Sequence, residues 1–211
     1  MRLVGRSLRD TLADAWERWG RRCAELTAAQ WRTATRCDAW DVQSLVAHVC
    51  PEATTFDGLV KARVEGLPAV TDAAEMLRIF NQPDGVANTT ADRIAAQAVQ
   101  EASTLSPAAA SARFADAADR MRRMPEMARA GETVIRYPVV GSTTLGVVAE
   151  VALLEATVHL LDLADAVGGV TPSAAALAAA RDLLIAVPDP ATAVEALAGR
   201  TPAHAVVPTI R

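Results

Sequence analysis

The chain has 211 residues, which is enough for one large domain or for one domain with a small appendage. Hydrophobic residues make up 51% of it but aromatic residues only 4%, so Ala, Leu and Val must form the core, which favours close-packed helices over a β-sandwich. The formal net charge is -4, and no basic cluster exceeds the pairs Arg21-Arg22 and Arg122-Arg123, which argues against nucleic-acid binding.

The cysteines and the N-terminus indicate the cellular compartment. The three cysteines are odd in number and widely spaced, with no CxxC motif, which is typical of a reducing compartment. Acidic residues follow the first basic ones without an apolar run, so no signal peptide is visible. The apolar run over residues 143–169 carries five ionisable side chains, too many for a lipid-facing span. We therefore expect a cytoplasmic protein that does not enter membranes.

The first part of the chain predicts two long helices. Apolar side chains recur at spacings of three and four over residues 6–26, with Arg and Glu on the opposite face, which predicts an amphipathic helix. Residues 27–37 indicate a loop or a short turn. Asp41 is a suitable N-cap for a second helix that reaches about residue 66, with a kink at Pro51.

Pro and Gly residues divide the middle of the chain into shorter elements. A short helix is predicted over residues 72–81, and Thr89 or Thr90 can cap another that ends near residue 105. Pro107 begins a further helix to about residue 124, because Pro favours the first helical position. Residues 125–143 predict a loop with one short extended piece.

The last third of the chain predicts three more helices. A long apolar helix ends at Gly168-Gly169, another runs from Pro172 to about residue 187, and a last one ends near Gly199. Long helices joined by loops describe a helical bundle, so the predicted fold class is all-α. The sequence contains neither a GxGxxG motif nor a P-loop, and nucleotide binding by these routes is unsupported.

Polar side chains form a stripe along the predicted apolar helix. Glu155 and His159 are four residues apart and therefore lie one above the other, and Asp162 continues the stripe three residues later. An ionised carboxylate inside such a helix costs several kcal/mol unless it is compensated. A divalent cation is one compensator, because Glu and His at this spacing can reach a single ion. A hydrogen-bonded core pair is the alternative.

A third ligand must come from elsewhere in the chain. Of the three histidines, His48 lies in a mostly apolar helical stretch that can turn inward, whereas His204 lies in a Pro-flanked tail that we expect to be exposed. The cysteines are expected to be poor ligands, and Glu52 is expected on a solvated helix face. Asp162 either holds the His159 ring by a hydrogen bond or is a polar residue near the helix end.

Two segments resemble a known family. Residues 35–49, TRCDAWDVQSLVAHV, are similar to the hallmark of the mycothiol-dependent maleylpyruvate isomerase N-terminal family, within the DinB-like superfamily. In that hallmark a Thr, a Cys and a Trp precede a helix written roughly V-x-x-L-V-A-H-L. Residues 155–168, EATVHLLDLADAVG, are similar to the family's E-x-x-x-H-x-x-D-[LI]-x-x-A-x-G helix. The motifs have the family's order and separation, and the resemblance covers at least residues 6–168.

The resemblance implies a DinB-like four-helix bundle over residues 1–169 and a short helical C-terminal extension over residues 170–211. It also implies a divalent metal, typically zinc with nickel or iron as alternatives, held by His48, Glu155 and His159. Three protein ligands leave one coordination position open, as in catalytic zinc sites. Family enzymes use this position for a low-molecular-weight thiol, usually mycothiol in actinobacteria. The resemblance therefore implies a thiol transferase or isomerase that acts on a small electrophilic or unsaturated substrate. The Ala-rich and Arg-rich composition also fits an actinobacterial source.

The chain also departs from the family pattern. The full isomerases carry a large C-terminal domain where this chain has only residues 170–211, so maleylpyruvate itself is not the expected substrate. Arg136 and Tyr137, on the loop before the last bundle helix, are candidates to meet a substrate carboxylate. Arg136 and Asp162 are the candidate catalytic residues, and Trp40 is expected to anchor helices to one another.

Two other functions stay open at this point. A DinB-like bundle can serve as a non-catalytic ligand-binding or regulatory module. Alternatively, a metal-dependent hydrolase or lyase can use metal-bound water, with Asp162 or Glu52 as the proton shuttle. A narrow apolar pocket without cationic groups would disfavour mycothiol, which is a large polar thiol. A homodimer formed through helix faces is also compatible with the sequence.

Overall fold

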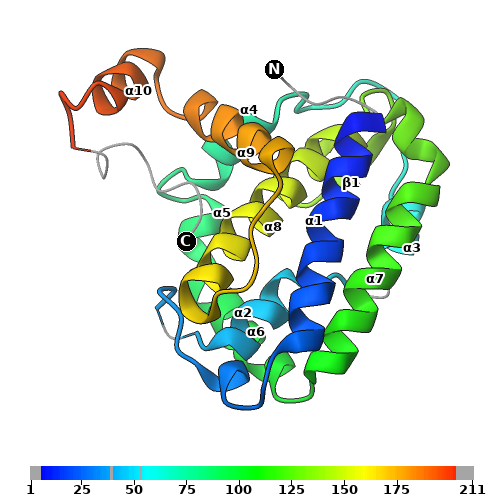
Figure 1. Cartoon of the computed structure of the whole chain (residues 1–211). Coiled ribbons are helices and arrows are strands. Elements are labelled where there is room, and N and C mark those ends of the chain that lie inside the picture. The colour runs from blue at the N-terminus through cyan, green and yellow to red at the C-terminus, as the bar shows by residue number, and fades with distance from the viewer. Residues whose placement is uncertain (1–5, 39, 53, 203–211) are drawn as a thin grey trace.

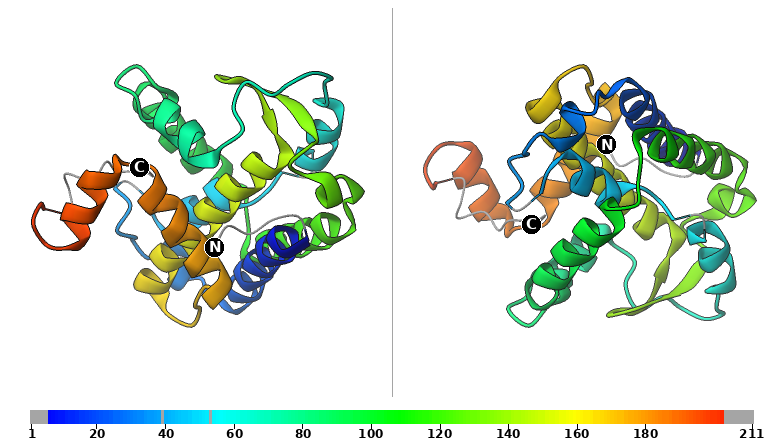
Figure 2. Two further views of the ribbon diagram at one scale, coloured as in Figure 1. Left: turned by 90° about the horizontal axis from the view of Figure 1, so that it is seen from above. Right: turned by 90° about the horizontal axis from the view of Figure 1, so that it is seen from below.

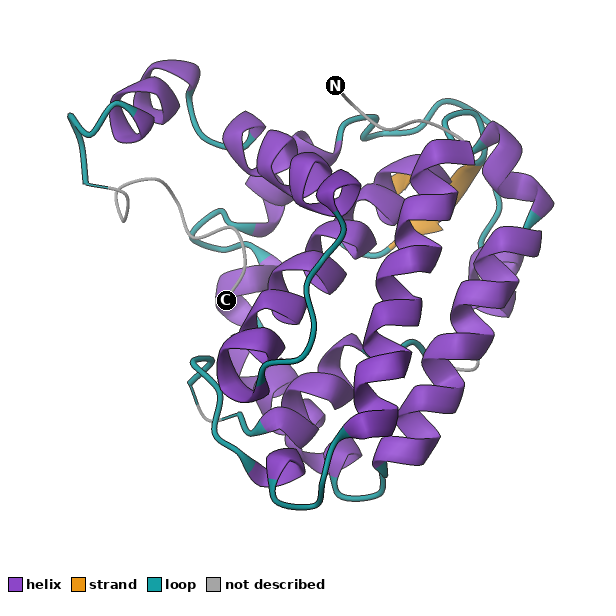
Figure 3. Ribbon diagram, viewed as in Figure 1, coloured by secondary structure: helices purple, strands orange, loops and turns teal. Residues whose placement is uncertain are grey.

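The structure is a computed structural model that describes residues 6–38, 40–52 and 54–202. This part of the chain is mostly helical, with one two-stranded antiparallel sheet (Figure 3). In chain order the elements are α1 (Arg6–Glu25), η1 (Gln30–Arg32), α2 (Val42–Val49), α3 (Thr55–Lys61), α4 (Ala73–Phe80), α5 (Val86–Thr89), α6 (Ala91–Ala102), α7 (Pro107–Arg123), η2 (Pro125–Arg129), β1 (Val134–Tyr137), β2 (Gly141–Thr144), α8 (Leu145–Val167), α9 (Ala174–Ala186) and α10 (Pro190–Leu197). The predicted all-α class and DinB-like bundle are confirmed.

The long helices pack around one core. α1 packs against both α7 and α8, and α2 packs against α6 and α8 (Figure 1). Trp19 on α1 is fully buried and ties three of these helices together. Its ring stacks on Phe114 of α7 at a centroid distance of 5.5 Å, and its Nε1 donates to the carbonyl oxygen of Ala156 on α8 at 2.9 Å. The apolar face of α1 thus packs at the centre of the bundle, against α7 and α8.

The helix predicted to begin after Asp41 is interrupted rather than kinked. Asp41 caps α2 as predicted, because its side chain accepts from the backbone N–H of Ser44. α2 ends at Val49, and Cys50 takes an extended conformation with φ -67° and ψ 118°. A residue before Pro is disfavoured in the helical region, so Pro51 ends the helix and α3 starts anew at Thr55. The prediction of one kinked helix to residue 66 is therefore wrong.

The segment before α8 forms a hairpin where one extended piece was predicted. β1 pairs with β2 from Val134 opposite Thr144 to Tyr137 opposite Gly141. Thr144 ends β2 and also caps α8, because its hydroxyl accepts from the backbone N–H of Val147. The hairpin therefore sets the point at which α8 leaves the sheet.

α8 is the central helix of the molecule, which explains why it is apolar around most of its circumference. It contacts α1, α2, α4 and α9, and it ends where Gly168 takes φ 64°. The predicted helices after it are present as α9 and α10, and α10 lies at the periphery, far from α1 and α7 (Figure 2). Within the described residues, no helix is both long and apolar enough to span a membrane.

α5 and α6 project from the bundle on the side opposite to α1 and α7 (Figure 2). α6 packs on α2, with Ala98 and Ala102 buried. Its start agrees with the predicted position at Thr90, although that side chain forms no capping hydrogen bond. The preceding turn, α5, was not predicted. The side of α8 that faces these elements carries the candidate site.

Candidate metal centre

Two helices bring three polar side chains to one point. α8 carries Glu155 and His159 on one face, and α2 presents His48 to them. The Glu155 Oε2 atom lies 3.4 Å from Nε2 of His159 and 3.9 Å from Nε2 of His48. The ring centroids of the two histidines are 5.2 Å apart. The structure thus brings together the three residues that the sequence predicts as metal ligands.

Asp162 holds the ring of His159. The His159 side chain is only 2% exposed, and its Nδ1 lies 2.8 Å from Oδ2 of Asp162. A carboxylate only accepts, so Nδ1 carries a proton, and Nε2 is the ring nitrogen left to coordinate a metal. Of the two roles open for Asp162, this geometry favours the one in which it orients His159.

The residues present fit a divalent cation. Nε2 of His159 is buried and has no hydrogen-bond partner among the described residues, although buried polar atoms are normally paired. One ligand atom from each of His48, Glu155 and His159 lies within 4.8 Å of the other two. Ligand atoms around a tetrahedral zinc are separated by roughly 3.4 Å, which follows from zinc–ligand distances of ~2.1 Å. A set of two nitrogens and one oxygen accepts zinc, and also nickel or iron.

The electrostatics of this cluster favour a bound positive charge. Burial by itself lowers the pKa of His159, but Asp162, Cys37 and Glu155 raise it, and the net pKa lies well above the ordinary value. Burial raises the pKa of Glu155, yet the two histidines outweigh burial and hold it below the ordinary value. The pKa of Asp162 is also lowered, because His159 and Arg36 outweigh the effect of burial. Without a metal, the carboxylates of Glu155 and Asp162 favour a proton on His159, and a bound cation would supply positive charge at the same place.

The loop before α2 adds residues that the sequence did not place in the site. Nε of Arg36 donates to Oδ1 of Asp162 at 2.6 Å, and Sγ of Cys37 lies 3.4 Å from Oδ2. The ring of Trp40 lies against that of His48, with centroids 4.7 Å apart. Trp40 therefore supports a candidate ligand as well as the helix packing. The available signal was that all three residues belong to the segment that resembles the family hallmark.

The cysteines divide into two groups. Cys23 and Cys50 are buried in the core, where burial raises the pKa of the Cys23 thiol to about 12 and that of Cys50 to about 11. Both lie away from the site, as predicted. Cys37 is the exception, because it forms a second group of potential ligand atoms with His159 and Asp162. The cysteines were expected to be poor ligands, and the position of Cys37 beside His159 and Asp162 was not anticipated.

A large cavity opens beside the cluster. Its volume is about 1460 Å³, and the lining residues come from the loop before α2, from α2, α4, α5, α6 and α8, and from the hairpin turn. Glu52 lines it from the exposed segment between α2 and α3. Tyr137 lines it from the end of β1, and burial together with the charge of Glu155 raises its pKa, so its hydroxyl stays protonated.

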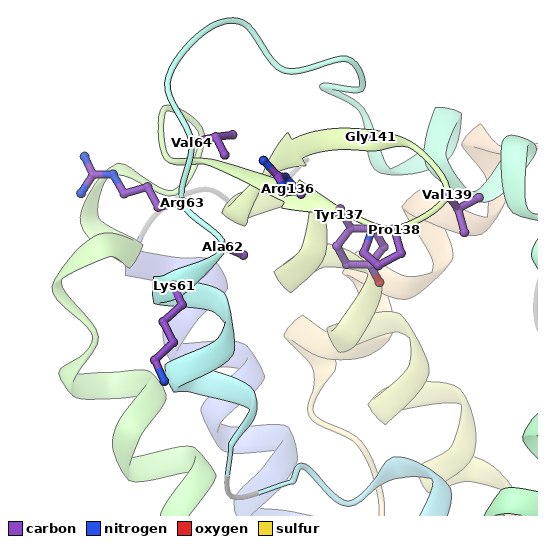
Figure 4. A pocket seen from close by; sticks show the side chains of 9 residues that line it. All are labelled: Lys61, Ala62, Arg63, Val64, Arg136, Tyr137, Pro138, Val139 and Gly141. Carbon is purple, nitrogen blue, oxygen red and sulfur yellow. The ribbon is translucent and has the colours of Figure 1, made fainter.

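Arg136 is not placed beside the cluster. It is exposed on β1 and lines a neighbouring cavity of about 770 Å³, together with Lys61 and Arg63 (Figure 4). The two cavities share the hairpin residues Tyr137, Pro138 and Val139. Side chains alternate between the two sides of a strand, so Tyr137 can face the main cavity while its neighbour faces away. The expectation that Arg136 meets a substrate at the predicted ligands therefore finds no support in its position. His204 lies outside the described residues.

Comparison with known proteins places the chain in a family. A search of curated proteins and a search of solved structures gave no match. A family model described as the mycothiol maleylpyruvate isomerase N-terminal domain matches residues 12–164, which is more than half of the chain. That stretch contains His48, Glu155, His159 and Asp162. The chain therefore belongs to the mycothiol maleylpyruvate isomerase N-terminal domain family, within the DinB-like superfamily.

Proposed function

We propose that this protein is a metal-dependent enzyme that uses a low-molecular-weight thiol of the mycothiol type. It either transfers the sulfur of the thiol to a small electrophilic substrate or isomerises that substrate. One observation carries the proposal: the buried Nε2 of His159, which forms no hydrogen bond with the described residues, converges with His48 and Glu155 beside a large cavity. Membership of a family named for a mycothiol-dependent isomerase supports the choice of thiol.

In this proposal the chain's own residues have distinct roles. His48, Glu155 and His159 hold the cation. Asp162 orients the ring of His159, and Arg36 fixes the carboxylate of Asp162 by its hydrogen bond at 2.6 Å. These supporting contacts keep the three ligand atoms close together, so little rearrangement is needed when the cation binds.

The proposed thiol reactions need neither an oxidant nor a reductant. A cation held by the three ligands supplies positive charge that favours the thiolate form of a bound thiol. In isomerisation, sulfur adds to one carbon of a conjugated double bond while the π pair moves toward the neighbouring carbonyl. Rotation about the new single bond and departure of sulfur restore the double bond in the other geometry. In transfer, sulfur displaces a leaving group that departs with the bonding pair.

The cavity suits a reaction between two molecules. Pockets for single small ligands are about 300–1,000 Å³, and this cavity of about 1460 Å³ has room for a thiol and a second substrate. It is not narrow, and Arg36 provides a cationic group in its lining. The features that would disfavour mycothiol are therefore not met among the described lining residues.

The first test is metal analysis of the purified protein by inductively coupled plasma mass spectrometry. We expect about one equivalent of a transition metal in the wild type and its loss in His159→Ala, as three-ligand sites predict. Glu150→Gln on the same helix is the matched control and should retain the metal. Near-zero metal in the wild type, even after incubation with zinc, would remove the enzymatic proposal and leave a ligand-binding module.

The second test measures turnover with the metal-loaded protein. Mycothiol and a conjugated alkene are mixed with enzyme, and adduct formation and cis–trans conversion are followed by NMR. We expect turnover that requires thiol and disappears in Glu155→Gln but not in Glu150→Gln. Turnover that is independent of thiol would instead identify an enzyme that uses metal-bound water.

A further inference from the structure

One wall of the main cavity is apolar. The side chains that form it come from α4, α5, α6, the hairpin turn and α8, and they are Leu77, Phe80, Val86, Ile94, Val139 and Val158. All but Leu77 keep part of their surface accessible. Exposed apolar surface gains about 25 cal/mol per Å² when a ligand covers it, so this wall favours an apolar ligand.

The hairpin turn contributes Val139 to this wall in a strained backbone conformation. Val139 has φ 76°, a conformation that β-branched residues rarely adopt, and its side chain is 60% exposed at the cavity. Next to it, the ring of Tyr137 stacks on Phe80 of α4 with centroids 6.4 Å apart. The turn and α4 together thus contribute aromatic and aliphatic side chains to the lining of the cavity.

The charges that line the cavity oppose a dianionic ligand. Arg36 is the one Lys or Arg side chain among the described lining residues, and it is already bonded to Asp162. Asp38, Glu52 and Asp92 also line the cavity, all are exposed, and none forms an ion pair with another described residue. These three carboxylates lie on the solvent-exposed part of the lining, which we call the entrance. Their negative potential repels anionic ligands and so disfavours them relative to neutral ones.

We propose that the electrophile is an uncharged, largely apolar molecule, and that dicarboxylates are excluded. This inference rests on the proposed function, because it names the class of substrate taken by that site. The apolar part of the electrophile lies on this apolar wall, and its reactive carbons face the cluster of His48, Glu155 and His159. The anionic entrance allows a neutral molecule through while it disfavours one that carries two carboxylates.

Binding is tested with two unreactive ligands of the same carbon skeleton, diethyl succinate and succinate. Saturation-transfer NMR and tryptophan fluorescence titration give their Kd values on the metal-loaded and the metal-free protein. We expect the diester to bind at least about tenfold more tightly than the diacid, which is a difference of ~1.4 kcal/mol. Equal binding, or tighter binding of succinate to the metal-free protein, would overturn the inference.

Variants locate the binding to the proposed wall. Ile94→Asp puts a charge on the wall and should weaken diester binding by about tenfold, because a carboxylate would have to be desolvated against an apolar ligand. Val99→Asp is the matched control, because Val99 is an exposed apolar residue of the same helix that does not line the cavity. Asp92→Asn removes one entrance charge and should improve succinate binding without changing diester binding. A loss with Val99→Asp equal to that with Ile94→Asp would contradict the location.

Turnover separates this inference from the proposed function. Diethyl maleate and maleate share one double bond, and each enzymatic rate is divided by the uncatalysed rate with the same thiol. Preference for the diester supports both proposals, and preference for maleate refutes the inference alone. If neither compound is turned over while the diester binds with the expected variant pattern, the proposed thiol chemistry is wrong and the apolar binding surface stands.

Discussion

Replacing Asp162 by Asn tests whether its hydrogen bond to His159 strengthens metal binding, while the three proposed ligands stay unchanged. The Asp162 side chain is 7% exposed and accepts from Nδ1 of His159 at 2.8 Å and from Nε of Arg36 at 2.6 Å. The amide keeps the shape of the side chain but removes the negative charge. His159 then loses a charge-assisted hydrogen bond that both fixes its ring and increases the basicity of Nε2.

The size of the effect follows from these contacts. Loss of a partner that supports a metal-bound histidine typically weakens metal binding by 10–100-fold. Arg36 already offsets part of the charge of Asp162, so we expect the lower part of that range, about 10–30-fold. The fold should survive, because the side chain of Arg36 is 52% exposed and water can solvate it when the carboxylate is gone.

The assay is competition for zinc against a chromogenic chelator, with circular dichroism to confirm folding. Asp165→Asn is the matched control, because Asp165 is an exposed carboxylate on the same helix. We expect zinc affinity to fall for Asp162→Asn and to stay within about twofold for the control. If Asp162→Asn binds zinc as tightly as the wild type while His159→Ala does not bind, Asp162 does not orient the ligand and the reasoning fails.

Three further predictions concern the fold. Trp19→Ala should lower the free energy of unfolding by about 3–5 kcal/mol, measured by urea denaturation, because it leaves a cavity at a fully buried position. A loss below about 1 kcal/mol would show that Trp19 is not central to the packing of α1 on α7 and α8. The hydrogen bond from Arg122 lowers the pKa of Glu17, so this pair stabilises the protein above the unfolded pKa and the benefit disappears as pH falls through the folded pKa. Glu17→Gln should therefore lower Tm at pH 7 by the equivalent of at most ~1 kcal/mol and by less at pH 3, and an equal loss at both values would refute this sign. Val139→Gly should raise stability by up to about 1 kcal/mol, because relief of the positive φ outweighs the added chain entropy, and a lower Tm would refute this reasoning.

Local patterns were sufficient for most helices and for placing Glu155 and His159 on one helix face. The caps at Asp41 and Asp72 start helices where predicted, because an N-cap acts on backbone groups only two or three residues away. The helix that carries Glu155 and His159 was predicted with its ends, since spacing along a helix determines which side chains share a face. The sequence predicts a kink at Pro51 where the structure has a break between α2 and α3. Proline disrupts a helix locally, but only packing against neighbouring helices decides whether the helix continues beyond it.

Contacts between distant segments required the tertiary structure. The second strand of the hairpin, the approach of Arg36 and Cys37 to Asp162, and the position of Arg136 in another cavity all depend on how segments far apart in the chain meet. The sequence by itself predicted most of the helices and, through the family resemblance, the candidate ligands and the family to which the chain belongs. Only the tertiary structure decided which loop supports the ligands and which side chains line the cavity, because these contacts arise from the packing of whole helices and leave no period or spacing in the sequence.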